Sequence, residues 1–91
     1  MDDRMVVIYF IGFIAMKTGL LIKNHDSRQT LEQAIAQAVA IYYRKNNTMP
    51  EVCAINAGVK GAPSHVGAVR VVKMHNVLRG HYWVGMEENN D

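Results

Sequence analysis

The chain has 91 residues, of which 49% are hydrophobic and 20% are charged, and its net charge is +2 with histidine neutral. This length allows one domain and excludes a second, and the composition is that of a globular chain rather than a disordered one. The single cysteine, Cys53, excludes an internal disulfide framework. One free thiol suits a reducing compartment, so we expect the protein to be cytoplasmic.

The most apolar part of the chain is the stretch from Met5 to Met16, MVVIYFIGFIAM, which has no charged side chain. Its β-branched and aromatic residues favour a strand with apolar side chains on both faces. Lys17 and Thr18 interrupt it before it reaches the length of a membrane-spanning helix. Asp2 and Asp3 are unlike the start of a secretory signal. We therefore expect a strand that needs cover on both faces, and no membrane partner.

The stretch after this strand predicts a hairpin and then a helix. Residues 16–19 have the composition of a tight turn in which Gly19 takes a positive φ, and residues 20–23 form the returning strand. Asp26, Ser27 or Thr30 can cap a helix of roughly 18 residues, since Thr30 with Gln33 has the spacing of a capping box.

The helix should be amphipathic. One stripe at helical spacing is apolar and faces a sheet, with Val39 on its flank: Leu31, Ala34, Ile35, Ala38, Ile41 and Tyr42. The opposite side carries polar residues and should face solvent: Glu32, Gln33, Gln37 and Arg44. Asn46 or Asn47 can end the helix in the left-handed conformation, and Pro50 cannot continue it.

The second half of the chain predicts three more strands, at 51–56, 67–74 and about 77–86. Residues 57–67 contain three glycines and a proline and predict a loop. The fold class is therefore α+β, a two-layer sandwich with one helix packed on a mixed, mostly antiparallel sheet of about five strands in the order ββαβββ. Residues 1–86 form this single domain, and 87–91 form a flexible acidic tail.

One helix covers only one face of such a sheet. Because the first strand is apolar on both sides, the second face needs another cover, and two-fold self-association is the commonest way to supply one. The leading hypothesis is a non-enzymatic assembly or binding module that is homodimeric through the helix-free sheet face. The predicted interface residues are Tyr9, Ile11, Phe13 and Trp83. The alternative set is on the other face of the first strand and includes Phe10 and Ile14.

A nucleic-acid-binding domain is the second hypothesis. Cations and aromatic residues mix in the run from Arg79 to Gly85, a composition that contacts phosphates and stacks on bases. The candidate anion-binding residues are Lys60, Arg70, Lys73, Arg79 and Tyr82, joined by Trp83. Residues 58–61, Gly-Val-Lys-Gly, match the Gly-x-x-Gly of KH domains, but their flanks are a strand and a proline rather than two helices.

Catalytic and metal sites find little support in the spacing of residues. His25, His65, His75 and His81 show no zinc-ligand spacing, so neither a metal nor a cofactor is expected. Ser64 precedes His65 directly, and such adjacency should point the two side chains apart. An enzyme is therefore the third hypothesis, with a site completed between subunits near residues 57–67 and using His65 or His81.

Overall fold

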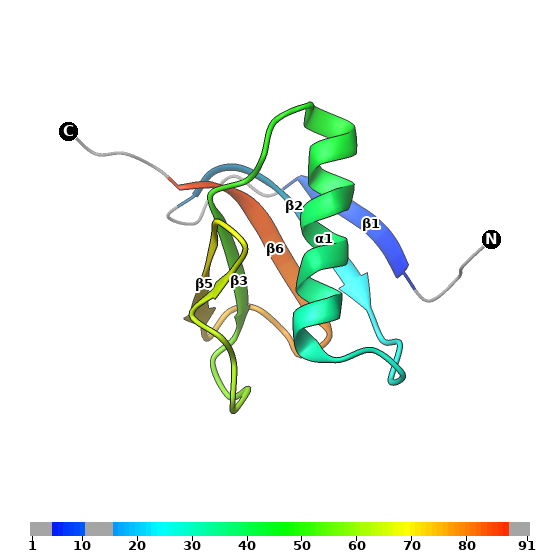
Figure 1. Ribbon diagram of the computed structural model, residues 1–91, viewed down its shortest axis with the longest axis vertical. Helices are drawn as coiled ribbons and strands as arrows, with labels where there is room; N and C mark the ends of the chain where they lie inside the picture. The colour runs from blue at the N-terminus through cyan, green and yellow to red at the C-terminus, as the bar shows by residue number, and fades with distance from the viewer. Residues whose placement is uncertain (1–4, 11–15, 88–91) are drawn as a thin grey trace.

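The computed structural model describes residues 5–10 and 16–87, and in it one helix lies across one face of a mixed sheet (Figure 1). Along the chain these residues form β1 (Met5–Phe10), β2 (Met16–Asn24), α1 (Leu31–Asn46), β3 (Val52–Asn56), β4 (His65–Val66), β5 (Val69–Met74) and β6 (His81–Glu87). The predicted α+β two-layer class is confirmed. The sheet has six strands because the two-residue β4 forms inside the segment that was expected to be a loop.

The order of the strands across the sheet is β1-β2-β6-β3-β5-β4. β3 and β5 pair in parallel, and every other neighbouring pair is antiparallel. The last strand of the chain, β6, therefore lies in the middle of the sheet, between β2 and β3. Parallel pairing of β3 and β5 has a further consequence, since the segments that follow these two strands leave the sheet at the same end.

The prediction is wrong about where the first strand ends and where the second strand begins. β1 ends at Phe10 rather than at Met16, and residues 16–19, expected to be the turn, are the first part of β2. Gly19 pairs with Gly85 of β6 and is not among the glycines with positive φ. At the other end of the chain, β6 continues through Glu87, one residue into the predicted tail.

The helix begins and ends as its sequence predicts. The Thr30 side chain accepts a hydrogen bond from the Gln33 backbone N–H, and the Gln33 side chain accepts one from the Thr30 N–H, which completes the capping box. Asn47 closes the C-terminus with a φ of 55°, and its N–H donates to the Tyr43 carbonyl. Among the three candidate caps, Thr30 is the one used.

The main core lies between α1 and the sheet. The predicted helix stripe is buried there, apart from Leu31, which is half-buried at the rim. The sheet supplies alternate residues of its inner strands: Ile22 of β2, Cys53 and Ile55 of β3, Val69 of β5, and Tyr82 and Val84 of β6. The remaining residues of these strands lie on the opposite face.

Candidate functional site

The face of the sheet that α1 leaves uncovered carries a second apolar cluster. We call it the helix-free face and define it by Leu21, Val52, Ala54, Val72, Met74, Val77 and Trp83. Four of these residues, Val52, Ala54, Val77 and Trp83, are at most 3% exposed. Leu21, Val72 and Met74 are half-buried around them. No helix or second sheet lies over this cluster in the described part of the chain (Figure 1).

Trp83 fills the centre of the helix-free face. It pairs with Leu21, and its indole reaches diagonally across Gly19, two residues earlier in β2. A Cβ atom on Gly19 would lie 2.3 Å from the Trp83 Cη2 atom, so the ring occupies the space of a side chain at position 19. The strand therefore needs glycine here for space and not for a turn. The buried Nε1 of Trp83 has no hydrogen-bond partner among the described residues.

The predicted interface residues have different positions in this structure. Trp83 is completely buried within the protomer, so it has no exposed surface of its own to offer a partner. Tyr9 takes the register position opposite Leu21, beside the helix-free face. Phe10, of the alternative set, takes the position opposite Leu20, whose side chain packs in the core under α1. Ile11, Phe13 and Ile14 lie outside the described residues.

A second surface is formed at one end of the sheet by three connecting segments. We call it the loop end, and it comprises residues 23–29, 57–63 and 73–81, which lie toward the bottom of Figure 1. Hydrogen bonds join the segments. The Asn24 N–H donates to the Gly80 carbonyl at 2.8 Å, and Arg79 Nη2 donates to the Gly58 carbonyl at 3.1 Å. The rings of His25 and His81 meet edge to face, with centroids 6.0 Å apart.

The glycine-rich loop does not present a phosphate-binding cradle at its start. The N–H of Ala57 donates to the Met74 carbonyl, that of Gly58 to the Asn56 side chain, and that of Val59 to the Asn56 carbonyl. These three consecutive amides are therefore engaged inside the protein, whereas an anion-binding nest needs them directed outward. Asn56 thus organises the turn, with its Nδ2 also donating to the Val77 carbonyl.

The five predicted anion-binding residues are divided by the fold. Lys60, Lys73 and Arg79 all lie at the loop end and are exposed. Arg70 lies toward the opposite end of β5, where it forms an ion pair with Glu87, and the hydrogen bond that its guanidinium donates to this carboxylate raises the pKa of Arg70. Tyr82 is buried under α1, and burial raises the pKa of its hydroxyl. Tyr82 and Trp83 therefore have no exposed ring on which a base could stack.

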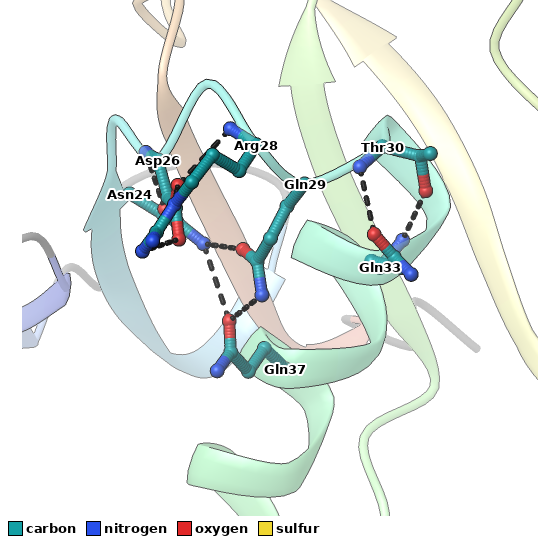
Figure 2. A network of polar contacts seen from close by, with 7 residues as sticks. All are labelled: Asn24, Asp26, Arg28, Gln29, Thr30, Gln33 and Gln37. Carbon is teal, nitrogen blue, oxygen red and sulfur yellow. Dashed lines mark hydrogen bonds and ion pairs between the residues drawn. The ribbon is translucent and has the colours of Figure 1, made fainter.

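A network of amides connects the loop end to the helix, as Figure 2 shows. Asn24 is 6% exposed, and its Nδ2 donates to Gln29 Oε1 at 2.8 Å and to Gln37 Oε1 at 3.4 Å. Gln29 Nε2 donates to the same Gln37 oxygen at 2.7 Å, while Asn24 Oδ1 accepts from the Asp26 N–H at 2.9 Å. Gln37 was expected to face solvent, but it is half-buried and holds the network together.

The one local signal of this network is the run Asn24-His25-Asp26-Ser27, whose short side chains bond to nearby backbone and stop a strand. The partners of Asn24 are Gln29, which precedes the helix, and Gln37, which lies within it, so no local motif connects them. Asp26 also binds Arg28, whose Nε and Nη2 atoms donate to the two carboxylate oxygens at 3.0 and 3.3 Å. This contact balances the charge of Asp26.

Within residues 5–10 and 16–87, no combination of side chains has the geometry of a catalytic site. Ser64 Oγ and His65 Nδ1 are 3.2 Å apart, which corrects the expectation that their side chains diverge. Both residues are exposed, and no carboxylate within the described chain bonds to His65 to orient it. Cys53 is fully buried, and this burial raises the pKa of its thiol to about 12, which leaves no thiolate at neutral pH.

The histidines do not form a metal centre. In the parts of the chain that are described, no three residues among His, Cys, Asp and Glu gather as metal ligands would. Among those same residues, no helix combines the length and the apolarity that crossing a membrane requires.

An open depression of about 400 Å³ lies between the start of α1 and the glycine loop, lined by Thr30, Leu31, Glu32, Gly61 and Pro63. Glu32 brings a negative charge into it, and Gln33 and Thr30 already bond the first-turn amides. The carboxylate of Glu32 would therefore repel an anion placed in this depression.

Comparison with known proteins gives no assignment: no family model, no curated protein and no solved structure matches the chain. The two surfaces, the helix-free face and the loop end, are therefore what the structure offers as a basis for function.

Proposed function

We propose that the protein is a small non-enzymatic assembly module that acts as a homodimer, with the seam along β1 and the adjoining helix-free face. The observation that carries this proposal is the apolar cluster on the sheet face that α1 does not cover. A layered fold buries each apolar face against another layer, and one helix supplies only one such layer. A second copy offers the same apolar surface, so the two copies can bury the β1 side of this face against each other.

The seam lies toward β1 because the middle of the helix-free face is already filled by Trp83. β1 is the edge strand next to it and pairs on one side only, with β2, among the described residues. Its sequence, MVVIYF, has no charge and no proline, two of the features with which natural edge strands avoid pairing with another chain, although its register with β2 shifts between Val7 and Tyr9. Antiparallel pairing of two β1 strands across a two-fold axis near Tyr9 would continue the sheet and bring the Tyr9 positions of the two copies close together, while Leu21 of each copy stays one strand behind its own β1.

We place the module in the cytoplasm. Support comes from the one cysteine of the chain, Cys53, which is buried as a neutral thiol and has no second cysteine to pair with. A reducing compartment keeps such a thiol free.

The proposal is tested by placing a lysine on the seam. Tyr9→Lys puts a charge at the position opposite Leu21, and we expect it to weaken dimerisation at least tenfold, because an unpaired charge would be buried between the two copies. Leu78→Lys is the matched control, since Leu78 is 67% exposed and belongs to the loop end. Sedimentation velocity over a range of micromolar concentrations measures the monomer–dimer equilibrium, and circular dichroism checks that both variants fold.

Two results would contradict the proposal. One is a wild-type chain that stays monomeric over the whole range. The other is a folded Tyr9→Lys variant that dimerises as tightly as wild type, which would place any seam elsewhere.

A further inference from the structure

The charges of the described residues are unevenly distributed between the two ends of the sheet. At the loop end, Asp26 and Arg28 neutralise each other. The other charged residues there are the cations Lys23, Lys60, Lys73 and Arg79 and a single carboxylate, Glu32, in the first turn of α1. At the opposite end, Arg70 pairs with Glu87, Glu51 accompanies Arg44 and Lys45, and Lys17 of β2 follows Met16, which pairs in register with Glu87. Among the described residues, positive charge therefore concentrates modestly at the loop end, where five cations accompany two carboxylates, against four cations and two carboxylates at the opposite end.

The fold itself creates this concentration, because the four cations other than Arg28 come from three segments that are distant in sequence. The parallel pairing of β3 and β5 sends the segments with Lys60 and Arg79 to the same end of the sheet. The hydrogen bond from Arg79 to the Gly58 carbonyl fixes one segment against the other. Lys23 pairs in register with His81, and Lys73 is one residue from the end of β5. Lys23, Lys60 and Lys73 are exposed and make no ion pair with any described residue.

We propose that the loop end binds the phosphate backbone of a nucleic acid duplex without reading its bases. A polyanion with closely spaced phosphates matches several cations on one surface and releases counterions when it binds. Contacts to phosphates alone carry no sequence information. Among the described residues, no Phe, Tyr or Trp ring on which a single-stranded base would stack is exposed at the loop end, since Tyr82 and Trp83 are buried.

An anionic membrane is the other polyanionic surface, and the loop end suits it less well. Interfacial binding needs an apolar group of residues that inserts below the headgroups. At the loop end, Leu78 is the one large apolar side chain that is strongly exposed among the described residues. Its neighbours on the surface are cations, histidines and amides. A duplex therefore matches the chemistry of the surface better than a bilayer does.

The test compares two charge-reversed variants that change the net charge equally. Lys60→Glu with Lys73→Glu reverses two cations of the loop end, and Arg44→Glu with Lys45→Glu reverses two at the other end of α1, a helix about 24 Å long. Fluorescence anisotropy with a labelled short duplex of mixed sequence measures binding. Circular dichroism and the emission of the single tryptophan verify the fold of both variants.

We expect the wild-type chain to bind the duplex in dilute salt and to lose roughly 10- to 100-fold in affinity between about 50 and 200 mM salt, as two to four phosphate contacts require. The loop-end variant should bind at least tenfold more weakly and with a flatter salt dependence, whereas the control variant should lose less than threefold. Affinity should not change with base sequence.

Four results would overturn the assignment. Absence of duplex binding in dilute salt would refute the assignment. Equal losses of affinity in the two variants would also refute it, because they would mean that only the net charge of the protein matters. Tighter binding to the single strand would contradict a backbone contact with a duplex. Tighter binding to phosphatidylserine vesicles than to the duplex at the same salt would assign the loop end to a lipid surface instead.

Discussion

Replacement of Gly19 by alanine tests the packing of the helix-free face directly. The new Cβ atom would lie 2.3, 2.4 and 2.7 Å from three carbons of the Trp83 ring. Carbon atoms in contact prefer separations of about 3.5 to 4.0 Å, so the ring must move by roughly 1 Å. Trp83 is completely buried, and its neighbours Leu21, Val52 and Val72 leave it no free space.

The expected loss follows from overpacking of a filled core, which costs about 1 to 3 kcal/mol. Taking about 2 kcal/mol for Gly19→Ala, the Tm of a domain of this size should fall by roughly 8 to 16 °C. Because the chain has one tryptophan, its emission reports this site. Urea unfolding followed by tryptophan fluorescence should therefore show both the lower free energy of unfolding and a shifted native emission maximum.

A matched glycine separates crowding from backbone strain. Gly67 has a φ of +60°, and no atom lies within 4 Å of the position of its Cβ. Gly67→Ala should therefore cost about 1 kcal/mol through its conformation alone and leave the emission maximum unchanged. In the Gly19→Ala background, Trp83→Phe should lose less stability than it does alone, because the smaller ring removes the clash. A Gly19→Ala variant within about 0.5 kcal/mol of wild type, with unchanged emission, would refute the packing described here.

Three further outcomes can be measured by urea unfolding or thiol titration. Thr30→Ala removes the capping hydroxyl of α1 and should lower the free energy of unfolding by about 1 kcal/mol. Asn24→Ala leaves the Asp26 N–H without its acceptor and should cost about 1 to 3 kcal/mol, more than the exposed change Asn76→Ala. Cys53 should not react with Ellman's reagent at pH 8 until urea unfolds the chain. Since its pKa is raised from 9.0 to about 12, the folded state keeps this proton while the unfolded state loses it, so stability should fall as pH rises from about 9 to 12.

The sequence was sufficient to predict the features that depend on local chemistry. The stripe from Leu31 to Tyr42 and the box of Thr30 and Gln33 specify α1 by spacing alone, and the structure confirms both. Alternation along the last strand likewise predicts Tyr82 and Val84 on one face and Trp83 on the other, and the structure confirms this. Each of these signals lies within one element, so no tertiary contact is needed to read it.

The errors concern residues whose role is set by distant partners. The sequence does not distinguish a glycine needed for a turn from a glycine needed to make room for an indole ring. For Gly19 the ring is that of Trp83, which is 64 positions away in the sequence. Gln37 has the polarity of a surface residue, and only its contacts with Asn24, the last residue of β2, and with Gln29 make it part of a buried network. The predicted anion-binding set combined residues of both ends of the sheet, because the parallel pairing of β3 with β5 has no local signature in the sequence.

One helix leaves the other face of the described sheet apolar and β1 at its edge, and we propose that a second copy pairs there. The most direct test is the mass of the unmodified chain in solution, measured by light scattering after size exclusion over a range of micromolar concentrations. We predict twice the mass of one chain, with dissociation only on dilution. A constant mass of one chain at every concentration would contradict the claim.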